Sequence, residues 1–228
     1  MDIERYILIL IISISATAVI AFFCSDRARD FLKRKFSNVK SFCKRISFLK
    51  ETDILGIKKI YRTRTEVENE NPFFSLHVST ELSSVKDMGM SLARIKNLGD
   101  ERIRSHLKCG CKFEFLLLDP SSPFMKQRTY QENPDLIGET NGFINWIENT
   151  FSTSEYRTQI DVWIYDLMPT MAISIINDNL LLVNPYSLLR RNQEFPVIEI
   201  KKGGTLFSLY KDEYEKVRGH AKTRRVFP

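Results

Sequence analysis

Residues 170–187 read TMAISIINDNLLLVNPYS. Two short apolar runs, 171–176 and 180–183, lie on either side of Asn177-Asp178-Asn179. Asn and Asp tolerate the left-handed backbone of a tight hairpin turn, so the stretch predicts two antiparallel strands joined at these residues. A strand pair of this kind indicates a sheet in the second half of the chain.

Outside this hairpin, apolar runs typical of strands alternate with segments of helical pattern. Further strands are predicted at 57–61, 85–92, 112–118, 159–165 and 197–200, and helices at 71–82, 100–108, 136–151 and 206–222. This alternation predicts α/β layers. Because no repeat or linker divides residues 51–228, we expect them to form one domain.

The net charge of +6 comes from one short segment. The 228 residues contain 34 Lys and Arg against 28 Asp and Glu. Residues 25–50 hold nine basic and two acidic residues, residues 1–24 carry a net −1, and residues 51–228 are neutral overall. A basic chain attracts phosphate, but here the domain itself has no excess of positive charge. The distribution therefore argues against nucleic acid as a partner.

Residues 6–24 read YILILIISISATAVIAFFC and contain no charged residue. About 20 apolar residues in a helix span the roughly 30 Å core of a bilayer, so we predict a single transmembrane helix within an anchor of residues 1–24. A cleaved signal peptide is the alternative, which the acidic leader and the Phe-Phe-Cys end of the run disfavour. The basic flank predicts a single-pass protein of the inner (cytoplasmic) membrane, with its N-terminus outside and its C-terminal domain in the cytosol.

The basic segment 25–50 also carries an apolar stripe. Its members alternate at steps of four and three residues: Leu32, Phe36, Val39, Cys43, Ile46 and Leu49. This spacing predicts a juxtamembrane helix whose basic residues hold anionic headgroups, so we expect residues 6–50 to contact membrane lipids. The helix either lies on the membrane or continues the anchor as a stalk, and a self-association seam is the alternative.

Two His-x-Lys pairs resemble a catalytic motif without completing it. The motif of phospholipase D-type phosphodiesterases places an Asp or Asn five residues after the Lys. After the pairs that begin at His106 and His220, those positions hold Phe113 and Phe227. A phenyl ring cannot orient an imidazole, so neither pair is expected to be catalytic.

Other catalytic or cofactor motifs are incomplete as well. Cys109-Gly110-Cys111 supplies two thiols, but no further Cys or His pair stands at ligand spacing to complete a zinc site. Lys202-Gly203-Gly204-Thr205 lacks the earlier Gly of a P-loop, and the chain has no Gly-x-Ser-x-Gly turn. We therefore predict no metal, no cofactor and no enzymatic activity.

Residues 170–187 resemble the second half of a phospholipase D-like domain. That family reads His-x-Lys, a short apolar strand, Asp-Asp, a second apolar strand and then Gly-Ser-x-Asn. Laid on this chain, the His falls on Thr170, the Lys on Ala172, the Asp on Asn177 and Gly-Ser on Asn184-Pro185. Residues 85–92 and 115–123 also resemble degenerate members of the superfamily found in bacterial signalling and defence proteins. The likeness covers most of residues 54–218.

The resemblance implies an α/β fold in which an N-terminal single transmembrane helix precedes a degenerate phospholipase D-like α/β sandwich over residues 51–228. Thr and Ala cannot form a phosphohistidine or hold its oxygens, so the domain is expected to be a pseudoenzyme. The resemblance further implies a homo-oligomeric, membrane-anchored effector of antiviral defence. Its cytosolic domain would bind a cyclic nucleotide or another phosphate-containing ligand, which controls assembly of the anchors or membrane disruption.

Candidate ligand contacts follow strands or surround the vacated catalytic slot. They are Ser91, Arg94, Asp119, Ser121, Thr170, Asn177 and Tyr186. The alternative is that these residues only cap helices and fill turns. Two other functions stay open at this point: a membrane-tethered scaffold that binds a partner protein, and a divergent phosphodiesterase or phospholipase with relocated catalytic groups.

Overall fold

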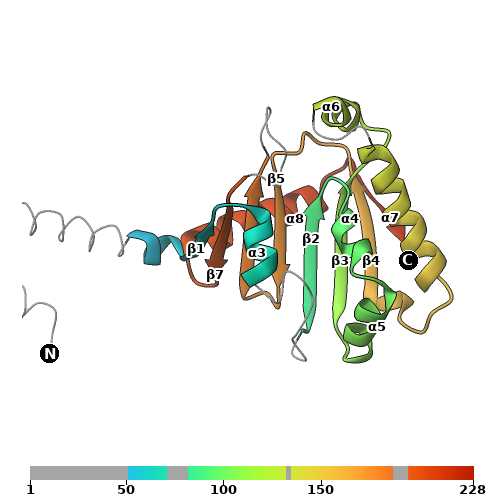
Figure 1. Ribbon diagram of the computed structural model, residues 1–228, viewed down its shortest axis with the longest axis horizontal. Helices are drawn as coiled ribbons and strands as arrows, with labels where there is room; N and C mark the ends of the chain where they lie inside the picture. The colour runs from blue at the N-terminus through green and yellow to red at the C-terminus, as the bar shows by residue number, and fades with distance from the viewer. Residues whose placement is uncertain (1–50, 71–81, 132–134, 187–194) are drawn as a thin grey trace, which may run out of the picture. The chain divides into compact units, whose positions relative to one another are not determined.

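The computed structural model describes residues 51–70, 82–131, 135–186 and 195–228. The compact unit Thr52–Pro228 contains one eight-stranded sheet, with the strand order β1-β7-β6-β5-β2-β3-β4-β8 (Figure 1). Its strands are β1 (Ile57–Tyr61), β2 (Ser84–Gly89), β3 (Lys112–Leu118), β4 (Ile160–Tyr165), β5 (Met171–Ile176), β6 (Leu180–Pro185), β7 (Val197–Lys201) and β8 (Thr223–Phe227). Its helices are α3 (Arg64–Glu70), α4 (Ala93–Asn97), α5 (Asp100–Lys108), α6 (Pro123–Gln131), α7 (Leu136–Phe151), the 3₁₀ turn η1 (Arg157–Gln159) and α8 (Thr205–Arg218).

Parallel pairing occurs in the middle of the sheet. Strand β2 pairs with β3 and β3 with β4 in parallel, and helices lie in both connections because parallel neighbours need a crossover. Strands β5, β6, β7 and β1 add antiparallel neighbours on one side, and β8 adds one on the other. The prediction of α/β layers is confirmed as a mixed sheet with helices on both faces.

The hairpin predicted from residues 170–187 is confirmed. Ile176 on β5 faces Leu180 on β6, and the turn residues Asn177 and Asp178 have φ angles of 52° and 51°. Left-handed angles at both central positions are those of the turn whose twist matches the strands. The Asn177 side chain also joins the hairpin to β2, because its Oδ1 accepts hydrogen bonds from the backbone N–H groups of Ser83 (2.8 Å) and Ser84 (3.2 Å).

Each face of the sheet has its own apolar core. The first face is covered by α3, α4, α5 and α7, which contribute buried residues such as Val67, Ile95 and Phe143. The second face is covered by α6 and α8, which contribute Met125 and Phe207. Figure 1 shows α3, α4, α5 and α7 in front of the sheet and α8 behind it.

The predicted helix over 206–222 is too long at its C-terminal end. Helix α8 ends at Arg218, and the chain turns at Gly219 and His220 into β8. Strand β8 is mostly exposed and basic, and it forms because the edge of β4 offers backbone hydrogen bonds to Thr223–Phe227. No local signal in Thr-Arg-Arg-Val-Phe encodes that partner.

Several other predictions fall on residues that are not described. The predicted helix 71–82 lies almost entirely outside the described ranges, as do the anchor 1–24 and the juxtamembrane helix 25–50. In the ranges that are described, no helix is both long enough and apolar enough to cross a membrane. The membrane segments therefore stay predictions from the sequence.

Tyr165, at the end of β4, makes stability sensitive to alkaline pH. Burial raises the pKa of its phenol well above the usual value, and Tyr186 adds to that rise while Arg128 opposes it. In the unfolded chain a tyrosine ionises near pH 10. The native state thus holds this proton more tightly, so its contribution to stability is complete below about pH 10 and is lost as the pH rises further.

We expect the free energy of unfolding to fall less steeply above about pH 10 in Tyr165→Phe than in the wild type, measured by urea denaturation across pH. Tyr130, which is 94% exposed, provides the control. Tyr130→Phe should follow the wild-type curve. If the free energy of unfolding falls equally steeply with pH in Tyr165→Phe and in the wild type, Tyr165 is not the cause of the loss of stability.

Candidate functional site

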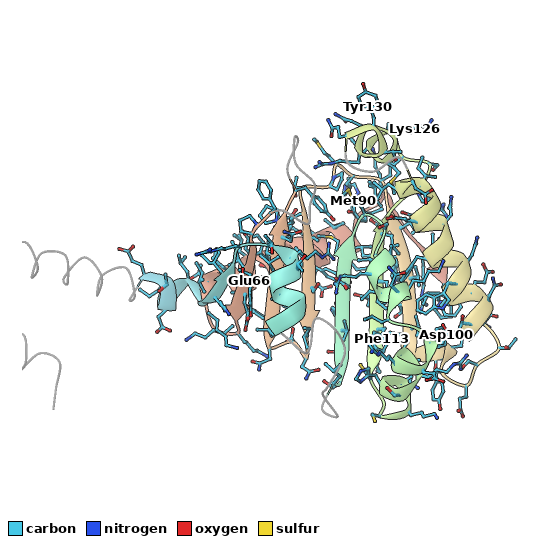
Figure 2. The ribbon with its side chains drawn as sticks, viewed as in Figure 1. Glu66, Met90, Asp100, Phe113, Lys126 and Tyr130 are labelled. Carbon is cyan, nitrogen blue, oxygen red and sulfur yellow. The ribbon has the colours of Figure 1, made fainter. Side chains whose placement is uncertain are left out.

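Most of the predicted site residues lie at one edge of the sheet, which here means the edge formed by the ends of the strands and not an outer strand. The parallel strands β2, β3 and β4 all end there, and β5 begins there because it runs antiparallel to β2. Figure 2 labels Met90, which follows β2 at this edge, and Phe113, which lies toward the opposite edge. Six of the seven candidates follow strand ends or precede strand starts at this edge: Ser91, Arg94, Asp119, Ser121, Thr170 and Tyr186.

Asp119 and Ser121 bond to each other within a turn, whereas Ser91 bonds to a residue far away in the sequence. Ser91 Oγ donates to Glu139 Oε2 on α7 at 2.9 Å. Asp119 Oδ1 accepts from the backbone N–H of Ser121 at 2.8 Å and from Ser121 Oγ at 2.7 Å. The Asp119–Ser121 contacts are those of residues that close a turn, which is the role that the sequence left as the alternative. The Ser91 contact instead joins the segment after β2 to α7.

Thr170 and Tyr186 lie side by side where β5 begins and β6 ends. The backbone N–H of Tyr186 donates to the Thr170 carbonyl at 2.9 Å, and Thr170 is exposed. The Arg128 guanidinium lies 5.4 Å from the centre of the Tyr186 ring and donates to the Pro169 carbonyl at 3.1 Å. The start of β5 is therefore held by α6 through a buried arginine.

Asn177 is not brought to this edge. It lies at the far end of β5, about 23 Å from Thr170 at roughly 3.3 Å per residue. Its Oδ1 already accepts from Ser83 and Ser84, which ties the hairpin to β2. The prediction that Asn177 and Thr170 surround one slot is corrected by this geometry, because consecutive residues of an extended strand cannot fold back on each other.

Arg94 does take part in a buried polar cluster on the first face. Its Nη2 donates to Asp87 Oδ2 at 2.7 Å, and Ser174 Oγ donates to Asp87 Oδ1 at 2.6 Å. Asp87 is 2% exposed and Ser174 is 6% exposed. A buried carboxylate needs such partners, and here they come from α4 and β5.

Glu199 on β7 extends this polar cluster along the same face. It accepts from Tyr61 Oη at 2.5 Å and pairs with Lys58 Nζ at 2.7 Å. Strand register places it in one row with the cluster, because Asp87 faces Ser174, Ser174 faces Leu182 and Leu182 faces Glu199. Residues that face each other across strands point to the same side of the sheet. Two buried carboxylates thus lie on one otherwise apolar face.

A small hollow of about 10 Å³, which has room for about one water molecule, lies next to this row. Its lining residues are Arg64, Ala172, Ser174, Leu182, Asn184 and Val197. Ala172 is the position onto which the phospholipase D-like pattern lays its lysine, and Asn184 faces it on β6. The hollow therefore lies where the resemblance expects a vacated catalytic group.

The start of α3 brings Arg64 to the hollow. Thr63 Oγ1 accepts from the backbone N–H of Glu66 at 3.3 Å, and Glu66 Oε2 accepts from the N–H of Arg62 at 2.6 Å. This reciprocal arrangement is a variant of the capping box, which satisfies N–H groups that a helix start leaves free. Arg64 is consequently held at the first turn of α3, over the strands β5 to β7.

The two described histidines lie elsewhere. His106 ends α5, near the start of β3, at the edge opposite to Thr170. His220 precedes β8, and strands β2, β3 and β4 separate β8 from β5. His77 lies outside the described residues. Neither described imidazole lies near the hollow, whose polar groups are the Ser174 hydroxyl, the Asn184 amide and the Arg64 guanidinium. The carboxylate beside Ser174 is that of Asp87, which is paired with Arg94.

Sequence reasoning missed the residues that make up most of this site. These are Arg64, Asp87, Ser174, Asn184 and Glu199. Asp87 and Glu199 each interrupt an apolar strand pattern, in Val-Lys-Asp-Met and Val-Ile-Glu-Ile, and a charged residue at an inward position was the available signal. Arg64 and Asn184 carried no such signal, because each is ordinary for a helix start or a strand end.

The cysteine pair shows no sign of metal binding. Cys109 and Cys111 are free, with Cys109 exposed and Cys111 buried. Burial and the neighbouring Cys109 raise the pKa of the Cys111 thiol to about 12, which disfavours the thiolate that a metal needs. Across the described ranges, no three Cys, His, Asp or Glu side chains gather as a metal site would require.

Removal of Arg94 should expose how strongly the Asp87 carboxylate depends on it. We expect Arg94→Met to lower the free energy of unfolding by roughly 3 kcal/mol, because it leaves a buried carboxylate short of its cation. The double variant Asp87→Leu/Arg94→Met should lose less than the sum of the single changes. Urea denaturation of all four proteins measures this coupling.

The exposed pair Lys201–Asp53 provides a control, with side chains 52% and 72% exposed. Lys201→Met should cost under about 1 kcal/mol. If Arg94→Met is no more destabilising than Lys201→Met, the buried Asp87–Arg94 pair does not stabilise the fold more than an exposed ion pair does.

Comparison with known proteins gives only structural similarity. The sequence matches no protein-family model and no curated protein. Among solved structures, it is similar to phosphatidylserine synthase of Haemophilus influenzae, with 13% identity over 73% of this chain and 39% of that chain and a TM-score of 0.46. It is also similar to the archaeal chromatin protein TrmBL2, whose structure shows a novel mode of DNA binding, with 14% identity over 84% of this chain and a TM-score of 0.43. The chain spans 63% of the length of TrmBL2.

A third similar structure is Nuc of Salmonella typhimurium, described as a phospholipase D family member. The identity is 9% over 64% of this chain and 83% of that chain, with a TM-score of 0.41. Members of the phospholipase D family are thus among the solved structures to which this mixed α/β fold is similar, at a level that does not assign the chain to that family.

Proposed function

We propose that residues 52–228 form a catalytically inactive, phospholipase D-like binding domain that holds the phosphate group of a small ligand over the hollow beside Ala172. The observation that carries the proposal is the small hollow beside Ala172, which Arg64, Ser174 and Asn184 border together with apolar side chains. Among the described residues, the side chains that line this hollow do not make up a complete catalytic set, and such a place is suited to binding and not to hydrolysis.

The absence of catalytic groups at the slot supports an inactive domain. Thr170 and Ala172 stand where the resemblance expects a nucleophilic His and a phosphate-binding Lys. A threonine hydroxyl is a poor nucleophile without an adjacent base, and a methyl group cannot neutralise a developing charge. Ser174, the other hydroxyl, donates its proton to Asp87, which is itself paired with Arg94.

Charge favours a phosphate group as the part that lies over the hollow. The hollow has room for about one water molecule, so the ligand rests over it and at most a single oxygen enters. Arg64 borders it and Arg94 lies in the adjoining cluster, while Asp87 and Glu199 already have cationic partners. Arginine recognises phosphate by charge-assisted hydrogen bonds, so the remainder of a cyclic nucleotide would lie outside the hollow.

The proposal joins this domain to the N-terminal segment. Residues 6–24 have the length and apolarity of a membrane anchor, and residues 25–50 have the basic flank that orients it toward the cytosol. An anchored binding domain without catalysis suits an effector whose homo-oligomeric assembly responds to a ligand. The assignment to bacterial antiviral defence, with membrane disruption as the output, rests on analogy with similar anchored proteins.

Binding can be measured on the full chain purified in detergent. We expect inorganic phosphate and cyclic AMP to raise its melting temperature and to give saturable calorimetric titrations. Arg64→Met should weaken cyclic AMP binding by about tenfold or more, because a charge-assisted hydrogen bond contributes roughly 1.5–3 kcal/mol. Arg157→Met serves as the matched control, since Arg157 is an exposed arginine on η1 and should not alter affinity.

Two results would contradict the binding proposal. One is an affinity for cyclic AMP that is the same in Arg64→Met as in the wild type. The other is hydrolysis of bis(p-nitrophenyl) phosphate by the wild type that disappears in His106→Ala/His220→Ala, which would identify an enzyme with relocated catalytic groups. If neither phosphate nor cyclic AMP binds and another protein copurifies with the chain, the scaffold function gains support.

Deletion of residues 6–24 tests the membrane part separately. We expect the full chain to sediment with membranes and to resist extraction by carbonate, and the deleted chain to remain in the supernatant, because the apolar run supplies the insertion energy. Replacement of the same run by 19 other apolar residues controls for the length of the segment. Membrane association that survives the deletion would show that the anchor lies elsewhere.

A further inference from the structure

The outer strand β1 and the residues beside it, which we call the β1 strip (residues 54–62), expose two isoleucines. The strip lies at one end of the sheet (Figure 1), and Ile54 is 58% exposed and Ile60 is 56% exposed. Ile60 faces Ile198, which packs against the core of the second face, so the Ile60 side chain lies at the outer border of that face. Among the described residues, the other exposed large apolar side chains lie on other elements: Tyr130, Met168 and Leu209. Two exposed isoleucines so close in sequence make the β1 strip an apolar part of the surface.

The β1 strip is also basic. Residues 57–65 contain no acidic residue and four basic ones, which are Lys58, Lys59, Arg62 and Arg64. Lys58 Nζ pairs with Glu199 at 2.7 Å, which offsets one of these charges, and Lys59 Nζ lies 4.6 Å from the centre of the Tyr61 ring. Both lysines remain exposed, and an ammonium has three donors, so one partner within the chain leaves it able to meet an anion from outside.

The position of the β1 strip in the chain brings it close to the predicted membrane segment. The basic segment that we expect to hold lipid headgroups ends at Lys50, and Ile54 follows it by four residues. Four residues span at most about 14 Å. Tyr130 and Met168 are exposed as well, but no predicted membrane segment lies near them in the sequence. The β1 strip is therefore held near the bilayer if the anchor is inserted.

A second copy of the chain fits the β1 strip less well than a membrane does. Pairing of β1 with the β1 of another copy would bring Lys58 and Lys59 close to the same lysines. The pairing of β1 is also irregular between Ile57 and Lys59, which interrupts an edge that another strand could extend. At the other end of the sheet, β8 has basic residues too, but its Phe227 is only 6% exposed. Positive charge with exposed aliphatic side chains thus distinguishes β1 from β8.

We propose that the β1 strip contacts the anionic surface of the membrane. Ile54 and Ile60 enter the boundary between headgroups and acyl chains, and Lys58, Lys59 and Arg62 contact the lipid phosphates. Exposed aliphatic side chains gain from burial at this boundary, and basic residues near it are attracted to anionic lipids. This inference rests on the membrane part of the proposed function and adds to it a contact made by the domain itself. The domain is then held against the bilayer and does not hang freely from the anchor.

Lysine labelling of the wild-type full chain tests the contact without any substitution. The chain is placed in nanodiscs of phosphatidylcholine, with or without phosphatidylglycerol, and treated with a water-soluble succinimidyl ester. Mass spectrometry then gives the labelling rate of each lysine. We expect Lys58 and Lys59 to react at least about threefold more slowly when phosphatidylglycerol is present, because the anionic lipid holds them at the surface. Lys126, an exposed lysine on α6 (Figure 2), should react at the same rate in both kinds of nanodisc.

A double variant tests the part of the isoleucines. In Ile54→Ser/Ile60→Ser, the labelling rates of Lys58 and Lys59 in phosphatidylglycerol nanodiscs should rise to within about twofold of those in phosphatidylcholine, because the apolar contact is lost. Met168→Ser serves as the matched control, since Met168 is 52% exposed and lies outside the β1 strip. It should leave the slow labelling unchanged. Melting temperatures of both variants confirm that the fold persists.

Each other outcome overturns the inference. Equal rates in the two kinds of nanodisc show that the β1 strip does not contact anionic lipid. Slow labelling in detergent that deepens with protein concentration identifies a second copy as the partner. Slow labelling that survives the double variant removes the role of the isoleucines. If the chain does not enter nanodiscs, the anchor and this inference fail together, whereas a failure to bind phosphate or cyclic AMP leaves the membrane contact standing.

Discussion

The Asp87 carboxylate, buried on the first face of the central strand β2, is the constraint on which this part of the fold depends. An ionised carboxylate that loses its partner in an apolar interior costs several kcal/mol, so Arg94 and Ser174 must remain within hydrogen-bonding distance. Arg94 comes from α4 and Ser174 from β5. One charge therefore joins the parallel half of the sheet to its antiparallel half and sets where α4 lies.

The same polar row explains why a hollow persists beside β5. Glu199 is satisfied by Tyr61 and Lys58, and Asp87 is satisfied by Arg94 and Ser174, so the face holds polar groups that an apolar side chain could not replace without leaving a charge unpaired. Ala172 lies beside this row, two residues before Ser174 on β5, and its methyl group fills little of the space. The small side chain of Ala172 leaves a hollow there with room for about one water molecule.

Local signals were sufficient for the hairpin and for the described strands other than β8. In residues 170–187 the turn chemistry of Asn177 and Asp178 and the flanking apolar runs agree, and the structure contains that hairpin. Local signals failed for β8, whose basic sequence becomes a strand only beside β4. They failed again for Asn177 as a ligand contact, because a residue at a turn and a residue at the start of the same strand lie at opposite edges of the sheet. Arg64 and Asn184 could not be found locally, since their shared hollow is formed by α3, β5, β6 and β7 together.

By itself, the sequence determined the spacing of apolar residues that marks a segment as helix or strand, and the turn at Asn177-Asp178. It also determined the lack of a complete catalytic motif and the concentration of positive charge in residues 25–50. Each of these depends on neighbours within a few residues, where backbone sterics and side-chain type act directly. Only the tertiary structure decided which residues meet at the site. Register across β2, β5, β6 and β7 placed Asp87, Ser174 and Glu199 in one row, and the packing of α3 and α4 supplied the arginines. Those contacts join residues as far apart as Arg64 and Val197, and no local pattern carries that information.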